Sequence, residues 1–245
     1  MPGMGAIGAT ITHTIMADAV DQAPNAGALL RLLTWLSPAF PTGAFAYSHG
    51  LEAAVAEGQV PNGEALGEWI ETLLLHGSGW NDLVFFAEAH RLARAGNEPA
   101  FHELAALARA SAGGAERRME TLDLGLAFAQ ASAPWSHSAD AFPAGAALPY
   151  PVAVGTLAGR EGVPLEAVLL AFAHAFASNL TSAAVRLVPL GQRDAVGTLK
   201  RLEPTVTEAA RRAGRSTLDD LGSCAILSDI AALRHETLAT RLFRS

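Results

Sequence analysis

Residues 37–52 have the sequence SPAFPTGAFAYSHGLE, and this stretch separates two segments with helical character. Pro38 and Pro41 fix the backbone φ angle and remove hydrogen-bond donors. Gly43 and Gly50 allow left-handed geometry or the close approach of another chain segment. The stretch therefore predicts a stiff connection that holds its aromatic and polar side chains at defined positions.

The chain around this connection has the composition of a helical protein. Ala, Leu, Glu and Arg dominate most windows, and alternating β-branched runs are scarce. Prolines and glycines stand where helices should begin or end. We therefore predict one all-α domain of about ten helices around a buried central helix. The predicted helices span residues 27–36, 48–57, 63–76, 79–95, 98–111, 114–131, 165–188, 192–202, 204–213 and 223–239.

Two segments do not fit this helical pattern. Residues 1–25 contain no Lys or Arg and are rich in small residues, so we expect a disordered leader rather than a secretory signal, before a domain that spans 26–245. Residues 133–151 contain four prolines, and we expect them to form the main irregular connection.

A charge-free run over residues 167–185 is long enough to cross a bilayer. Polar residues interrupt its second half, and His174 lies near its centre. A helix buried among other helices has the same all-round apolar character. We therefore predict that residues 165–188 form the buried central helix and that the protein does not enter a membrane.

The charge and cysteine content limit the classes of function. The formal net charge is −7, which argues against the basic surface of a nucleic-acid-binding protein. The single cysteine, Cys224, cannot form an internal disulfide and suits a reducing compartment, so we expect a cytoplasmic protein. We expect Cys224 itself to be a small buried apolar residue.

Several catalytic and metal-binding motifs are absent from the sequence. The chain has neither a P-loop nor a Gly-x-Ser-x-Gly elbow. His235-Glu236 resembles the start of a zinc-binding helix, but the second histidine would fall on Ala239. The eight histidines are dispersed. We therefore assign no catalytic residue and no metal ligand.

His49 and Glu52 are three residues apart and can share one face of a helix. They could form an acid–base pair or part of a metal site. Alternatively, they mark a helix start in which Ser48 is the N-cap. The residues favour this second interpretation. Tyr47 is either an interface anchor or a core residue, and the sequence alone leaves both open.

Two charged segments are further candidates. A charged cluster follows a glycine pair and consists of Glu116, Arg117, Arg118, Met119 and Glu120. It is either a set of helix-surface charges or a partner-binding patch, with an arginine finger for a GTPase as one variant. The end of the chain, residues 241–245, has a Leu-Phe pair between two arginines. Such a pair should dock, either on the body of the chain or on a partner, and it could become ordered on binding.

Four ordered motifs together resemble the urease accessory protein F family (UreF). They are the stretch 37–52, YPVAVG at 150–155, SNLTSAAVRLVPLGQ at 178–192, and RHETLATRLFRS at 234–245. The similarity covers residues 29–245 and is weaker near 193–197 and 223–227. Residues 1–25 have no counterpart in it.

The resemblance implies an all-α, homodimeric, non-enzymatic scaffold in urease maturation. Such a scaffold binds UreD (also called UreH), recruits the GTPase UreG and supports GTP-dependent nickel insertion into apo-urease. Nickel then passes through the complex, GTP is bound by the partner GTPase, and no cofactor is bound tightly. The candidate partner-binding residues are Tyr47, Ser48, His49, Glu52, Glu116, Arg118, Arg234, His235, Arg241, Leu242, Phe243 and Arg244.

An alternative from a different class is a small all-α enzyme. It would use His49, Glu52 and Glu116 in a cleft. Metal-dependent turnover by the purified chain alone would favour this alternative, whereas activity only within a urease-maturation complex would favour the scaffold.

Overall fold

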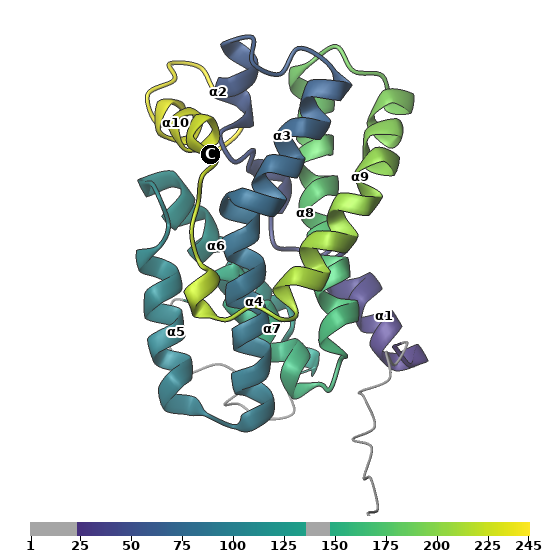
Figure 1. Cartoon of the computed structure of the whole chain (residues 1–245), viewed down its shortest axis with the longest axis vertical. Coiled ribbons are helices and arrows are strands. Elements are labelled where there is room, and N and C mark those ends of the chain that lie inside the picture. The colour runs from purple at the N-terminus through teal and green to yellow at the C-terminus, as the bar shows by residue number, and fades with distance from the viewer. Residues whose placement is uncertain (1–23, 136–147) are drawn as a thin grey trace, which may run out of the picture.

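The computed structural model describes residues 24–135 and 148–245, and every regular element in these residues is helical (Figure 1). The α-helices are α1 (Ala26–Trp35), α2 (Leu51–Ala56), α3 (Gly63–His76), α4 (Ser78–Ala95), α5 (Glu98–Ala110), α6 (Ala115–Ala131), α7 (Tyr150–Arg160), α8 (Leu165–Leu187), α9 (Gln192–Ala213) and α10 (Ile226–His235). Short 3₁₀ helices are η1 (Ala44–Ala46), η2 (Ala133–Trp135) and η3 (Leu218–Asp220).

The all-α prediction is confirmed, and several helix starts follow from the capping residues. The Asn62 side chain accepts hydrogen bonds from the Glu64 and Ala65 amides, both at 3.0 Å, and so caps α3 at the start of the predicted range 63–76. Asn25 and Asn97 cap α1 and α5 in the same way. Most of the predicted leader and of the predicted irregular connection lies outside the described residues.

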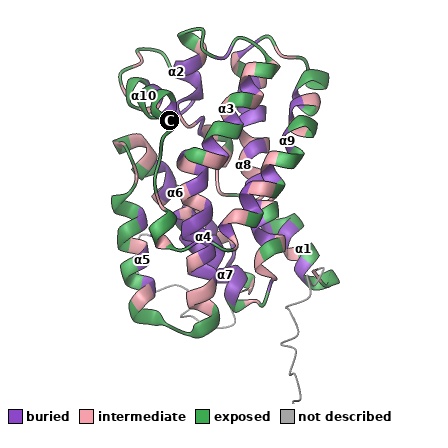
Figure 2. Cartoon of the chain, viewed as in Figure 1, coloured by how far each residue is buried: buried purple, intermediate pink, exposed green. Residues whose placement is uncertain are grey.

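The sequence missed α7, which follows the proline-rich connection directly. Its β-branched residues and two glycines have low helix propensity, so local preference did not indicate a helix. Every residue from Pro151 to Gly159 is buried, so packing against other helices stabilises α7 despite its low propensity. Figure 2 shows α4 and α7 as largely buried elements of the bundle.

Glycine makes the contact between α4 and α7 unusually close. A Cβ atom at Gly155 would lie 2.5 Å from the Phe86 carbonyl oxygen, and one at Gly159 would lie 2.6 Å from the His90 carbonyl oxygen. The two glycines are four residues apart and therefore lie on one face of α7. The backbones of α4 and α7 can approach this closely only because the residues at these two positions have no side chain.

The prediction of two helices on either side of Pro204 is wrong, since α9 is continuous through it. Pro204 is exposed, and the buried face of α9 continues on both sides of it from Thr198 to Val206 and beyond. This face packs against α3 and α8. Packing along 22 residues outweighs the loss of one helical hydrogen bond at the proline.

The predicted central helix, α8, has the expected bounds and packs against α2, α3, α4, α7 and α9. Among the described residues it is the one helix long and apolar enough to cross a membrane, and half of its most apolar window is buried in the protein. One stripe remains exposed, at Glu166, Leu170, His174, Ser182 and Arg186. The four-residue spacing of this stripe shows that α8 faces solvent along one side.

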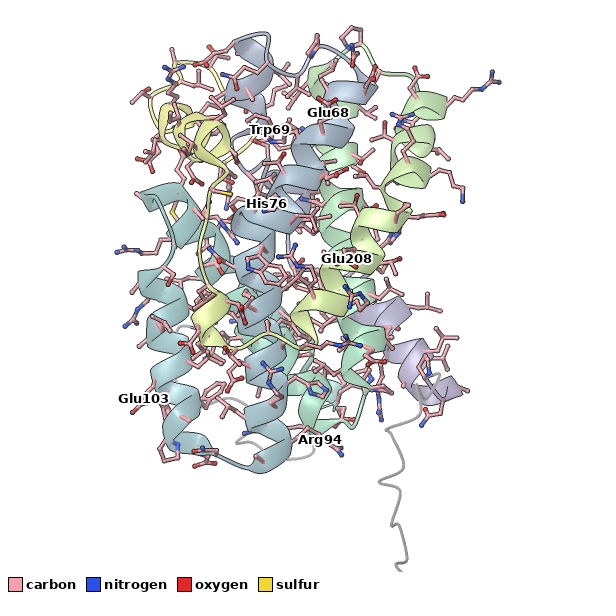
Figure 3. The ribbon with its side chains drawn as sticks, viewed as in Figure 1. Glu68, Trp69, His76, Arg94, Glu103 and Glu208 are labelled. Atoms are coloured by element: carbon pink, nitrogen blue, oxygen red, sulfur yellow. The ribbon has the colours of Figure 1, made fainter. Side chains whose placement is uncertain are left out.

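The predicted helix 223–239 is wrong at both ends, because α10 spans only Ile226–His235. Residues before it form an extended segment, where the Cys224 amide donates to the His76 carbonyl oxygen at 2.9 Å. Figure 3 labels His76 at the end of α3, beside this segment. Cys224 is exposed there, which corrects the expectation of a buried thiol.

We expect Gly155→Ala to lower the free energy of unfolding by about 2 kcal/mol or more, because the added methyl group would overlap the Phe86 carbonyl. Gly197→Ala is the matched control, since it also lies inside a helix but its Cβ would meet Arg201 at an ordinary 3.7 Å. This control should be neutral or stabilising by up to about 1 kcal/mol. Urea unfolding of both variants tests the comparison, and equal effects would contradict it.

Candidate functional site

The proline- and glycine-rich stretch forms a surface against which the end of the chain packs. Gly43, His49 and Gly50 have positive φ angles of 79°, 53° and 76°. A Cβ atom at Gly50 would lie 2.6 Å from the Ala232 backbone nitrogen, so glycine also lets α10 pack directly on this turn. Helix α2 begins after Gly50 rather than after Ser48, which corrects the predicted N-cap, although the Ser48 hydroxyl still accepts from the Glu52 amide at 3.3 Å.

The last residues of the chain, 241–245, are called the tail here, and they dock on the body of the protein. The Arg244 amide donates to the Ala46 carbonyl at 2.8 Å, and the Ser48 amide donates to the Ser245 carbonyl at 2.7 Å. The Phe243 ring is 4% exposed and belongs to the hydrophobic core, with the Arg186 guanidinium 4.5 Å from its centre. Figure 1 shows the C-terminal end beside α2 and α10. Of the two predicted docking modes, the structure has the one on the chain's own body.

Glu52, on α2, holds the tail through its backbone. Its two carboxylate oxygens accept hydrogen bonds from the Leu242 amide at 2.7 Å and the Phe243 amide at 3.0 Å. Burial acts to raise the pKa of Glu52, but these amides and the His235 ring favour the carboxylate and leave the pKa below its ordinary value. Glu52 is therefore an ionised group that recognises main-chain N–H groups.

His235, at the end of α10, links Glu52 to a second carboxylate. Its Nε2 lies 3.1 Å from a Glu52 oxygen, and its Nδ1 lies 2.6 Å from a Glu116 oxygen. The imidazole ring is fully buried. The other Glu116 oxygen accepts a hydrogen bond from the Arg241 guanidinium. Three successive tail residues, 241 to 243, are thus held by two carboxylates that one histidine connects.

Glu120, one turn after Glu116 on α6, binds the last residue of the tail. Its carboxylate accepts from the Ser245 hydroxyl at 2.9 Å and lies 2.9 Å from His49 Nε2. Arg117 contacts both Glu120, at 3.5 Å, and Asp82. Burial would raise the pKa of Glu120, but the positive groups and the hydrogen bonds lower it to about 2.

His49 and Glu52 do not form the acid–base pair that the sequence left open as the less favoured interpretation. His49 precedes α2 and turns to Glu120, whereas Glu52 turns to His235 and the tail. Arg117 is paired with the buried Glu120 and the half-buried Asp82, while Arg118 is exposed. Of the two arginines considered as an arginine finger, Arg118 is therefore the exposed one, and Arg117 is not.

Two pockets lie beside this network. One of about 250 Å³ is lined by residues that include Glu116, Asp229 and Glu236, and another of about 210 Å³ by residues that include Tyr150 and His174. Both are lined by the same four charged or titratable side chains, His49, Asp82, Arg117 and Glu120. Among the described residues, no group of three or more His, Cys, Asp or Glu side chains is arranged to hold a metal ion.

The predicted partner-binding residues fall into three groups by exposure. Tyr47 is buried, and its hydroxyl donates to Asp123 at 3.2 Å. Burial raises the pKa of this hydroxyl. Buried with it are Ser48, Glu52, His235 and Phe243, and half-buried are His49 and Glu116. The exposed members of the set are Arg118, Arg234, Arg241, Leu242 and Arg244.

Two members of the site, Asp82 and Asp123, were not predicted from the sequence. Arg117, Glu120 and Ser245 were named in the charged cluster and the tail, but not among the partner-binding residues. One signal was present in α6. Glu116, Glu120 and Asp123 are spaced four and three residues apart, which places three acidic side chains on one face of a helix. No signal in the sequence indicated that this face meets the tail.

Comparisons with known proteins agree on one family. The sequence model of the UreF family matches residues 60–203. The urease accessory protein UreF of Agrobacterium fabrum is 52% identical over 219 residues, covering 89% of this chain and 96% of the relative. The UreF of Mesorhizobium japonicum is 52% identical over 226 residues, covering 92% and 99%. The UreF of Rhizobium etli strain CIAT 652 is 54% identical over 220 residues, covering 89% and 96%.

The lowered pKa of Glu120 predicts a loss of stability in acid. A carboxyl whose pKa falls from 4.5 unfolded to about 2 folded stabilises the protein fully above pH 4.5, and this stabilisation disappears as the pH falls toward 2. Urea unfolding from about pH 6 down to about pH 3 should therefore show a falling free energy of unfolding.

Glu120→Gln should be less stable at about pH 6 but should lose less stability on acidification. Glu203→Gln is the control, because Glu203 forms an exposed pair with Lys200 at 2.5 Å. It should keep the wild-type pH slope. A wild-type slope in Glu120→Gln would contradict the assignment.

Proposed function

Because the chain belongs to the UreF family and supports urease maturation, we propose that it acts as a non-enzymatic scaffold. In this proposal it binds UreD/UreH and recruits the GTPase UreG, so that GTP bound by UreG drives nickel insertion into apo-urease. Nickel is cargo of the complex rather than a resident cofactor. We further propose that the chain works as a cytoplasmic homodimer.

The observation that supports a partner-binding role is an apolar stripe on α10. Ile226, Leu227, Ile230 and Leu233 are 66%, 64%, 39% and 51% exposed. Their spacing places them on one face of the helix. Leu242, in the tail beside α10, is 60% exposed. Figure 2 shows the outer side of α10 as exposed.

A concentrated apolar face differs from single exposed apolar residues, which are ordinary on protein surfaces. Two arginines on the same elements, Arg234 of α10 and Arg241 of the tail, are also exposed. An apolar centre with an arginine rim is the usual composition of a protein–protein interface. We therefore assign UreD/UreH to the α10 stripe and Leu242.

The docked tail supports this assignment in a second way. Glu52 and Ser48 fix the main chain of Leu242 and Ser245, so the exposed Leu242 side chain is held beside the stripe rather than free to move. A pre-ordered surface loses less conformational entropy when a partner binds. The same contacts occupy both oxygens of Glu52, which leaves this carboxylate committed to the tail rather than free to act on a substrate.

Leu227→Asp should weaken capture of UreD/UreH by roughly thirtyfold or more, the effect of losing about 2 kcal/mol at an interface hot spot. The measurement is co-purification with UreD/UreH and UreG, with and without GTP. Val196→Asp is the matched control, because Val196 is an equally exposed apolar residue, 65% exposed, on α9.

Both variants should keep the wild-type melting temperature, since each changes an exposed side chain. The control should also keep wild-type capture of both partners. Undiminished capture of UreD/UreH by Leu227→Asp would contradict the assignment of this surface.

A further inference from the structure

His235 is a buried titratable group with acidic neighbours on two sides. Its side chain has no exposed surface, and its ring nitrogens lie 2.6 Å from Glu116 and 3.1 Å from Glu52. Each of these carboxylates also holds the tail, Glu52 through the Leu242 and Phe243 amides and Glu116 through Arg241. Residues 241–243 are held by these two carboxylates. Among the contacts of the described residues, His235 is the only side chain that contacts both of them.

A neutral imidazole has one N–H group and one bare nitrogen, whereas the imidazolium has two N–H groups. A carboxylate oxygen can only accept. Both contacts of His235 are therefore hydrogen bonds only in the imidazolium, and in either neutral tautomer one nitrogen lone pair faces a carboxylate. We propose that docking of the tail is linked to a proton on His235, so that loss of this proton releases residues 241–245.

The charged groups around His235 support a link between tail docking and a single proton. Glu52 of α2 and Glu116 of α6 face the ring directly, and Arg241 of the tail faces Glu116 from the other side. Glu236 is turned away and accepts the Ala115 and Glu116 amides at 2.7 and 3.3 Å. Arg234 pairs with Glu57. The imidazolium therefore balances Glu52, a carboxylate that contacts no other cation within residues 24–135 and 148–245.

His49 does not impose the same requirement. Only its Nε2 contacts a carboxylate, Glu120, while its Nδ1 makes no hydrogen bond among the described residues. The neutral Nε2–H tautomer satisfies that contact. Because both histidines contact carboxylates that hold the tail, the Glu116→Gln variant below is needed to assign a pH effect on tail docking to His235. If the tail helps to form the partner surface, which rests on the proposed function, partner binding would follow the same proton.

The test measures opening of the tail in the isolated full chain. In a Cys224→Ser background, which removes the exposed native thiol, Ser245→Cys places a thiol at a position that is 5% exposed. Its labelling rate, divided by that of a free peptide of the same tail sequence at the same pH, gives the open fraction. We expect this fraction to rise about tenfold or more between about pH 6 and pH 9, as one charge-assisted hydrogen bond is lost.

Glu116→Gln is the decisive variant. The Gln amide can donate to a neutral Nδ1 while Nε2–H still donates to Glu52, so the open fraction should become nearly independent of pH in this range. Glu57→Gln is the matched control. It removes a carboxylate that pairs with the neighbouring Arg234 at 2.6 Å but lies outside the network, and it should keep the full wild-type pH dependence.

The protonation state itself provides a second readout, the ¹⁵N spectrum of the His235 ring at about pH 6. We expect both ring nitrogens to carry protons in the docked state. The proposal is overturned by a flat wild-type open fraction, by equal pH dependence in Glu116→Gln and Glu57→Gln, or by a docked ring with a single N–H. Since no partner is present in these measurements, their failure would leave the proposed binding of UreD/UreH untouched.

Discussion

The site depends on one interaction, in which the Glu52 carboxylate accepts the backbone amides of Leu242 and Phe243. Residues 190 positions apart in the sequence are joined by this contact. It places Phe243 in the core and brings Ser245 within hydrogen-bonding distance of Ser48 and Glu120. Without the docked tail, the buried Glu52 and Glu120 would each lose hydrogen bonds that stabilise their ionised forms. The tail is therefore part of the folded domain rather than an appendage to it.

The interaction has consequences for the surface that faces outward. Helix α10 packs directly on Gly50, and the tail returns from α10 to the same turn. The apolar stripe of α10 and the exposed Leu242 are thus supported by buried polar contacts beneath them. The exposed apolar side chains proposed to bind a partner and the buried charged side chains beneath them thus lie on the same short elements, α2, α10 and the tail.

Local sequence signals predicted much of the fold. Asn62 and Asn97 mark the starts of α3 and α5, Gly96 marks the end of α4, and composition predicted the all-α class. The failures have a common cause. Helix α7 and the continuity of α9 through Pro204 arise from packing against other helices, which no local window contains. The partners of His49 and Glu52 could not be predicted for the same reason, because Glu120 comes from α6 and His235 comes from α10, 183 residues beyond Glu52. Family resemblance identified the stretch 37–52 and the tail as important, but only the structure shows that they bind each other.

The most direct test of the Glu52 contact is hydrogen exchange of the Leu242 and Phe243 amides, measured by NMR in the isolated protein. Both amides should exchange far more slowly than in a free peptide of the same sequence, and Glu52→Gln should increase both rates while leaving the buried amides of α4 protected. Exchange of the two amides at free-peptide rates in the wild-type protein would contradict the account, because it would mean that the tail is not held by Glu52.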